Sequence, residues 1–159
     1  MTKLARPHPP PASTFRSGSK NVVVGASVMQ RLLAQSKEPT PLMLAGLVHN
    51  GLQISVLDQL LSIGLTQQEL ALVAPPRTLA HRRAKKQTLT SDESDKVVRI
   101  GRVIAAAERV FADPARARLW LRASLKRFDG NTPMQMLSSE AGGRIVEELL
   151  IQIDEGYFA

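Results

Sequence analysis

The sequence predicts an all-α protein, and three observations support this prediction. Apolar residues recur at intervals of three and four along most of the chain, and hydroxyl or carboxylate residues stand where helices would begin. No stretch alternates convincingly between apolar and polar residues, as a strand would. With 159 residues, 43% of them hydrophobic, the chain can bury a core in one or two small helical domains.

The first 88 residues divide into a tail and a helical domain. Residues 1–20 hold four prolines with scattered Ser, Thr and Lys, a composition typical of a disordered basic tail. Three valines at 22–24 could form a short strand, but the helical spacing that follows favours a helix over residues 27–35. Further helices are predicted over residues 41–50, 55–64, 66–74 and 76–85. Residues 21–88 are therefore interpreted as the first domain.

Residues 89–159 form the second predicted domain. A capping box at Thr90 and Glu93 opens a long helix that extends to about residue 112. Further helices are expected from Asp113, from Thr132 and over residues 139–154. The acidic residues at the start of the long helix suit the helix dipole, so we interpret them as structural rather than catalytic.

Charge is distributed unevenly along the chain. Lys and Arg number 21 and Asp and Glu 14, for a net charge of +7 and a pI near 10.4, which favours an anionic partner such as nucleic acid. Residues 75–86 hold five cations and no acid, whereas residues 128–159 hold six acids and the single cation Arg144. The chain is predicted to carry two surfaces of opposite sign.

The break at Pro75 and Pro76 between two predicted helices, the second of them basic, fits a helix-turn-helix motif. On the basic helix, Arg77, Thr78, His81 and Arg82 would face base edges and phosphates, and Arg83, Lys85 and Lys86 would contact the DNA backbone. The alternative is an ordinary solvated helix with a basic face.

Composition and motifs give little support to catalysis, cofactors, metals or membranes. Cysteine is absent, the three histidines lack metal-ligand spacing, and no phosphate loop or nucleophile motif occurs. The longest apolar run, residues 42–48, is far shorter than the ~20 residues of a membrane helix, and the early prolines replace a secretory signal. We expect a cytoplasmic, non-enzymatic protein.

Two of the six aromatic residues stand at the C-terminus, beyond an acidic helix end. Such residues can insert into a partner's pocket or fold back over the domain's own core, and the residues by themselves slightly favour the fold-back. This terminal segment comprises Asp154, Glu155, Gly156, Tyr157, Phe158 and Ala159.

Several short runs occur in a specific order: RTLAHRRA at 77–84, LTSDESD at 89–95, AERVFADP at 107–114, ARLWL at 117–121, TP at 132–133, EAG at 140–142 and IDEGYFA at 153–159. Their order and spacing resemble antitoxins of the Xre/MbcA/ParS group. The resemblance extends from about residue 42 to the C-terminus. Residues 124–131 and the extra proline at the helix break depart from the pattern, so no toxin contact is assigned to residues 124–131.

The resemblance implies a type II antitoxin that represses its own operon and binds a RES-domain toxin, a toxin similar to ADP-ribosylating enzymes and acting on NAD. It also implies that residues 154–159 block the toxin's active-site entrance, which reverses the preference for a fold-back. A homodimer formed through the DNA-binding half, assembled with the toxin into a larger complex, is expected. The alternatives are a stand-alone helix-turn-helix regulator whose second domain dimerises, and a structural scaffold without DNA binding.

Overall fold

The computed structural model describes residues 27–156, and those residues fold into helices and connecting loops without a strand. The all-α prediction is confirmed for this range. The expected tail over residues 1–20 and the possible strand at 22–24 lie outside the described residues. The elements are α1 (Val28–Leu33), α2 (Pro41–Asn50), α3 (Val56–Ser62), η1 (Glu69–Leu72), α4 (Pro76–Lys85), α5 (Ser91–Phe111), α6 (Pro114–Leu121), η2 (Lys126–Phe128), α7 (Pro133–Met136) and α8 (Glu140–Asp154), where η marks a 3-10 helix.

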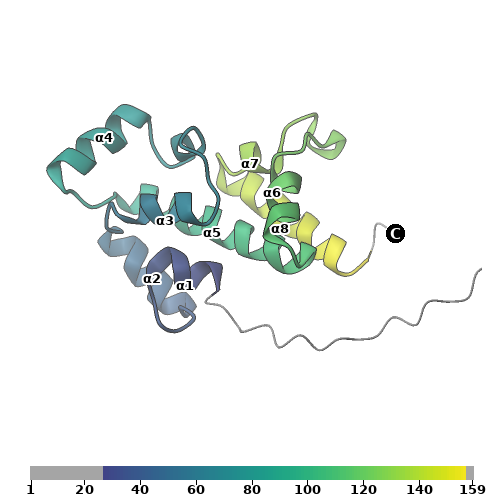
Figure 1. Cartoon of the computed structure of the whole chain (residues 1–159), viewed down its shortest axis with the longest axis horizontal. Coiled ribbons are helices and arrows are strands. Elements are labelled where there is room, and N and C mark those ends of the chain that lie inside the picture. The colour runs from purple at the N-terminus through teal and green to yellow at the C-terminus, as the bar shows by residue number, and fades with distance from the viewer. Residues whose placement is uncertain (1–26, 157–159) are drawn as a thin grey trace, which may run out of the picture.

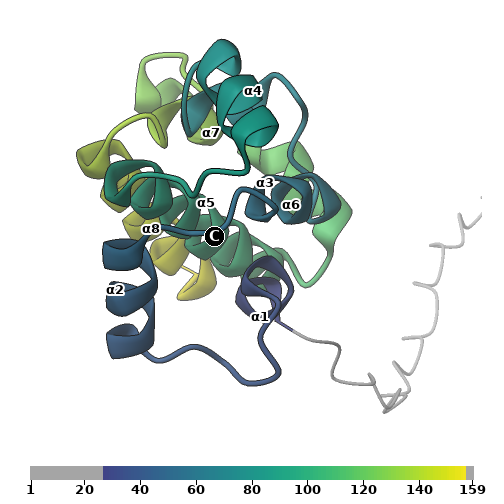
Figure 2. The same ribbon diagram turned by 90° about the vertical axis from the view of Figure 1, so that its left-hand side faces the viewer.

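Helix α5 is the axis of the fold (Figure 1). Its 21 residues contact α1, α2 and α3 on one side and α6 and α8 on the other. The second view, turned by 90°, shows the same central position (Figure 2). Its apolar positions recur every three to four residues, which places Val97, Ile100, Val103, Ile104 and Ala107 in the core, each at most 3% exposed.

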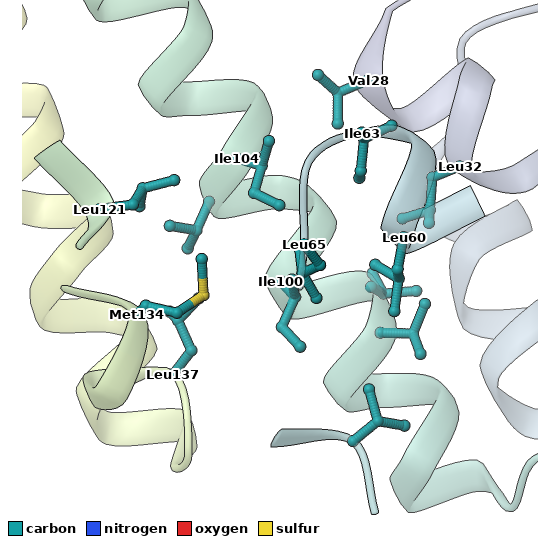
Figure 3. Packing of buried hydrophobic residues seen from close by; sticks show 14 of the residues in the cluster. Val28, Leu32, Leu60, Ile63, Leu65, Ile100, Ile104, Leu121, Met134 and Leu137 are labelled. Atoms are coloured by element: carbon teal, nitrogen blue, oxygen red, sulfur yellow. The ribbon is translucent and has the colours of Figure 1, made fainter. Parts of the chain in front are cut away.

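One hydrophobic cluster runs through both halves of the chain. Figure 3 shows Ile100 and Ile104 of α5 between Leu60 on one side and Leu121 and Leu137 on the other. Buried apolar side chains therefore connect residues on both sides of the predicted boundary between residues 88 and 89. The division into domains 21–88 and 89–159 stays a prediction.

The capping residues act where the sequence indicated. Thr90 accepts a hydrogen bond from the backbone N–H of Glu93, and the Glu93 side chain accepts one from the backbone N–H of Thr90. Thr132 forms the same reciprocal box with Gln135, and Thr40 caps α2. Because capping satisfies N–H groups that a helix leaves unpaired, these residues fix the start of each helix.

The α-helix predicted over residues 66–74 does not form. Its capping box forms, because Thr66 and Glu69 exchange hydrogen bonds, but the segment that follows is the single 3-10 turn η1. Backbone bonds from Ala71 to Gln68 and from Val73 to Leu70 have the tighter spacing of three residues. The segment must end before Pro75, and 3-10 geometry is common in such short pieces.

The segment that joins α4 to α5 is packed against the fold. The backbone N–H of Leu89 donates to the carbonyl of Leu52 at 2.8 Å, and the Leu89 side chain is 2% exposed. Gly51 has a φ of 80°, and a Cβ there would lie 2.3 Å from the Leu89 carbonyl oxygen, so glycine permits this crossing. The connection therefore fixes α4 relative to the body of the protein.

Candidate functional site

Helix α4 stands at one end of the molecule and presents most of its surface to solvent (Figure 1). Leu79 is its one buried residue in the structure described, and it holds the helix against the core. Arg77, His81 and Lys85 are exposed, and Thr78 is half-buried. A protruding basic helix held by an apolar anchor has the form of a helix that enters the major groove of DNA.

Arg82 is partly buried and is paired within the protein. Its Nε lies 3.0 Å from a carboxylate oxygen of Glu93, and its Nη1 donates to the carbonyl of Thr88 at 3.4 Å. The Arg82 side chain is 21% exposed and that of Glu93 is 9% exposed. The guanidinium thus joins α4 to the start of α5, and its predicted contact with DNA bases stays a prediction.

Arg83 forms a second ion pair that holds α4. Its Nη2 lies 2.7 Å from Oδ1 of Asp58 in α3, and both side chains are well exposed. Such an exposed pair contributes little to stability, so a phosphate can replace the carboxylate at small cost. Among the residues described, Arg77, Lys85 and Lys86 make no ion pair, and these cations are directly available to a polyanion.

The roles of Glu93 and Asp58 in holding α4 were missed by the sequence analysis. The capping box placed the Glu93 carboxylate at the start of a helix, but its pairing with Arg82 joins residues from two different helices. Asp58 gave no comparable pattern. Only the position of α4 in the folded chain brings these charges together.

The described end of the terminal segment is exposed and acidic. Asp154, Glu155 and Gly156 are all exposed, and neither carboxylate has an ion-pair partner among residues 27–156. The last turn of α8 contains no basic residue, so two anions stand at the negative end of the helix dipole. Negative charge at this end of the helix is locally unfavourable. Locally unfavourable residues of this kind are common at functional sites. The remaining predicted residues, Tyr157, Phe158 and Ala159, lie outside the described range.

A third exposed surface is apolar. Helix α2 has the sequence PLMLAGLVHN, and none of its residues is buried. Leu42 is 84% exposed, and a Cβ on Gly46 would meet no atom within 4 Å. A nearly uncharged helix with an open apolar face is typical of a protein contact.

Arg122 links the two halves of the chain. Its Nε and Nη2 each lie 2.7 Å from a carboxylate oxygen of Glu69, and Nη2 also donates to the carbonyl of Gly64 at 2.8 Å. Burial acts to raise the pKa of the Glu69 carboxyl group, but hydrogen bonds from Arg122 and Thr66 outweigh it, and the net pKa is lowered. The same pairing raises the pKa of the Arg122 guanidinium.

Two further observations concern membrane spans and Trp120. None of the helices within residues 27–156 combines the length and apolar character needed to cross a bilayer. Trp120 is half-buried and packs on Phe111 with ring centroids 5.5 Å apart. It therefore contributes to packing.

A basic helix on a helix-turn-helix frame, followed by a second helical unit with an acidic end, defines a class of helix-turn-helix proteins with an added interaction domain. Residues 43–102 match the Antitoxin Xre-like helix-turn-helix domain, and residues 106–156 match the Antitoxin Xre/MbcA/ParS C-terminal toxin-binding domain. The chain belongs to the Xre/MbcA/ParS antitoxin family.

Two curated relatives are similar to this chain. Antitoxin Xre of Pseudomonas putida is 46% identical over 93 residues, which are 58% of this chain and 58% of that protein. Antitoxin Xre of Yersinia enterocolitica is 28% identical over 113 residues, which are 69% of this chain and 76% of that protein. The match thus spans a little more than half of the Pseudomonas protein.

Proposed function

We propose that this chain is the antitoxin of a type II toxin–antitoxin pair and that it works in the cytoplasm without catalysis of its own. It neutralises a RES-domain toxin that acts on NAD by occluding the toxin's active site with residues 154–159. It represses its own operon by binding operator DNA through α4. The observation that carries this proposal is the separation of the basic helix and the acidic helix end along the longest axis of the molecule (Figure 1).

Support for the DNA contact comes from α4. The exposed Arg77 and His81 can reach base edges, while Arg83, Lys85 and Lys86 can neutralise phosphates. Thr78 is half-buried beside them and offers a hydroxyl. Arg82 acts on this surface chiefly by holding α4 in place through Glu93.

Support for the toxin contact comes from the end of α8. Asp154 and Glu155 carry negative charge where their own helix disfavours it, and a cationic pocket on the toxin would relieve this. The aromatic residues Tyr157 and Phe158 follow directly in the sequence, and aromatic side chains are typical anchors of an interface. Occlusion by a chain end requires no chemistry from the antitoxin.

We assign the exposed face of α2 to a second copy of this chain. The helix carries no Asp, Glu, Lys or Arg, so two copies can meet about a two-fold axis without placing like charges opposite each other. Leu42 and Met43 would be buried in that contact, and Gly46 would allow the two helices to approach closely. A dimer of this kind would carry two DNA-binding helices and bind two toxins.

The experiment is growth rescue with the toxin gene expected beside this one. The full chain and a chain ending at Glu155 are co-expressed with the toxin, and co-purification and binding to the promoter fragment are measured in parallel. We expect the truncated chain to bind promoter DNA normally while losing most rescue, because it lacks the residues that enter the active site.

Three other results would each contradict one part of the proposal. Full rescue by the truncated chain removes the assignment of residues 156–159. A non-toxic neighbour and no co-purified partner contradict the antitoxin role and favour a stand-alone regulator. Failure of the full chain to bind its promoter contradicts the operator-binding half of the proposal.

A further inference from the structure

A second basic segment lies in the half of the chain that matches the toxin-binding domain. Residues 114–128 contain five cations and neither Asp nor Glu, which equals the cation count of the α4 region, residues 75–86. These cations are Arg116, Arg118, Arg122, Lys126 and Arg127. The acidic character of the C-terminal half therefore begins only after this segment.

Two of these arginines fasten the segment to the helix-turn-helix. Arg122 pairs with Glu69 of η1 through two 2.7 Å contacts. Arg118 lies over Gly64, where a Cβ would come within 2.6 Å of the arginine Cδ. Because Gly64 and Glu69 belong to the segment between α3 and α4, these contacts fix α6 beside the helix-turn-helix.

The turn that follows α6 points two further cations outward. Phe128 is 4% exposed and anchors the turn, whereas Lys126 and Arg127 are exposed. The turn is closed by backbone hydrogen bonds from Leu125 to Asn131 at 3.1 Å and from Gly130 to Leu125 at 3.1 Å. The backbone that carries these cations is thus held in a defined conformation.

The turn between α6 and α7 and helix α4 lie on the same side of the molecule. In Figure 1 both occupy the upper side, above α5, and the same holds in the view turned by 90° (Figure 2). Helix α2 lies on the lower side in both views. A duplex bound by α4 on this side can therefore also reach the turn that carries Lys126 and Arg127.

We propose that Lys126 and Arg127 contact the phosphate backbone of the same DNA duplex that α4 enters. This extends the DNA surface beyond the helix-turn-helix and rests on the proposed operator binding. The contact supplies affinity without reading sequence, because lysine and arginine neutralise backbone phosphates, which are the same at every base pair. Asp129 adjoins the pair on the same turn and offsets part of its charge.

The alternative partner of Lys126 and Arg127 is the toxin, but the charges of the two surfaces favour DNA. The segment is cationic and fastened to the DNA-binding motif, whereas the surface assigned to the toxin is acidic and lies at the far end of α8. The test therefore measures DNA and toxin binding on the same variants.

The test uses the full chain with Lys126→Gln and Arg127→Gln combined. The matched control combines Arg31→Gln and Lys37→Gln, which also removes two exposed cations. Arg31 pairs with Glu108 and belongs to α1, which lies on the lower side in both views. Binding to the promoter fragment and to an unrelated duplex is followed by fluorescence anisotropy over a series of salt concentrations. Thermal unfolding confirms that each variant is folded.

We expect the double variant to lose about three- to tenfold in affinity for both duplexes, with a log–log salt slope smaller by about 1 to 2 than that of the wild type. Toxin co-purification should be unchanged. An affinity and a salt slope equal to those of the double control overturn the inference. Normal DNA binding with loss of the toxin also overturns it and would assign the turn to the toxin. If the wild-type chain does not bind its promoter, the proposed operator binding fails and this inference fails with it.

Discussion

Arg77 and Arg82 illustrate how one residue type can serve two purposes on the same helix. Both Arg77 and Arg82 belong to the basic run of α4, but Arg77 is exposed and Arg82 is paired with a carboxylate that is 9% exposed. Removing a partner from a largely buried charge costs stability, whereas removing an exposed charge does not. Substitution of Arg77 should therefore affect DNA binding, whereas substitution of Arg82 should affect the free energy of unfolding.

We predict that Arg77→Ala weakens operator binding by about 1–3 kcal/mol without changing the melting temperature, if Arg77 reads a base. Arg82→Ala should instead lower the free energy of unfolding by about 1–3 kcal/mol, because the Glu93 carboxylate loses its cation. Urea unfolding and promoter binding, measured on both variants, check this. Unchanged stability of Arg82→Ala would show that the ion pair does not hold α4.

Glu69 should make stability depend on pH. Its pKa is lowered in the folded protein from an ordinary value of 4.5, so its contribution is present above that value and is lost as the pH falls through the folded pKa. The wild type should exceed Glu69→Gln in unfolding free energy at neutral pH, and this difference should shrink between about pH 5 and pH 3. In an Arg122→Gln background the pH dependence should largely disappear.

At the scale of elements, close helix contacts depend on a few glycines. The first turn of α8 passes over the end of α7, and a Cβ on Gly142 would lie 2.1 Å from the carbonyl oxygen of Met136. Backbone atoms cannot move aside as a flexible side chain can. Gly46 on α2 is the opposite case, because a Cβ there would meet no atom within 4 Å.

We predict that Gly142→Ala destabilises the protein by about 1–3 kcal/mol through overpacking. Gly46→Ala should stabilise it by up to about 1 kcal/mol, because alanine is the better helix former at an open position. Both are measured by urea unfolding at protein concentrations low enough to keep the chain monomeric. Equal stability of the two variants would contradict the packing of α8 on α7.

The whole molecule separates its surfaces in space. The basic helix and the acidic helix end lie at opposite ends of the longest axis, while the apolar α2 lies on the lower side in both views (Figures 1 and 2). DNA, toxin and a second copy can therefore occupy different faces. This arrangement is compatible with simultaneous binding of all three.

Leu42→Glu should convert the proposed dimer to a monomer, because two carboxylates would meet in an apolar contact. The molar mass from light scattering checks this. Ser36→Glu, an exposed loop position, adds the same charge as a control. A dimeric mass that Leu42→Glu leaves unchanged contradicts the assignment of α2 to a second copy, and loss of the toxin in that variant would assign α2 to the toxin.

The helices themselves could be predicted from the sequence. Helix limits depend on backbone hydrogen bonds and dihedral angles within a few residues, as at the caps Thr90 and Thr132 and the breaks Gly51 and Pro75. They can therefore be predicted from nearby residues. The basic run of α4 was visible for the same reason. The 3-10 geometry of η1 was not, because a proline-bounded stretch of that length suits either helix type.

The helical fold class, the limits of most helices and the opposite charge of the two surfaces can be predicted from the residues alone, because each follows from neighbours along the chain. Three other features depend on tertiary packing: Arg82 faces Glu93, Arg122 joins Glu69, and α4 shares a side with the turn at Lys126. The two ion pairs span 11 and 53 residues of chain. They depend on how helices pack around α5, because the hydrophobic core sets which distant charges meet.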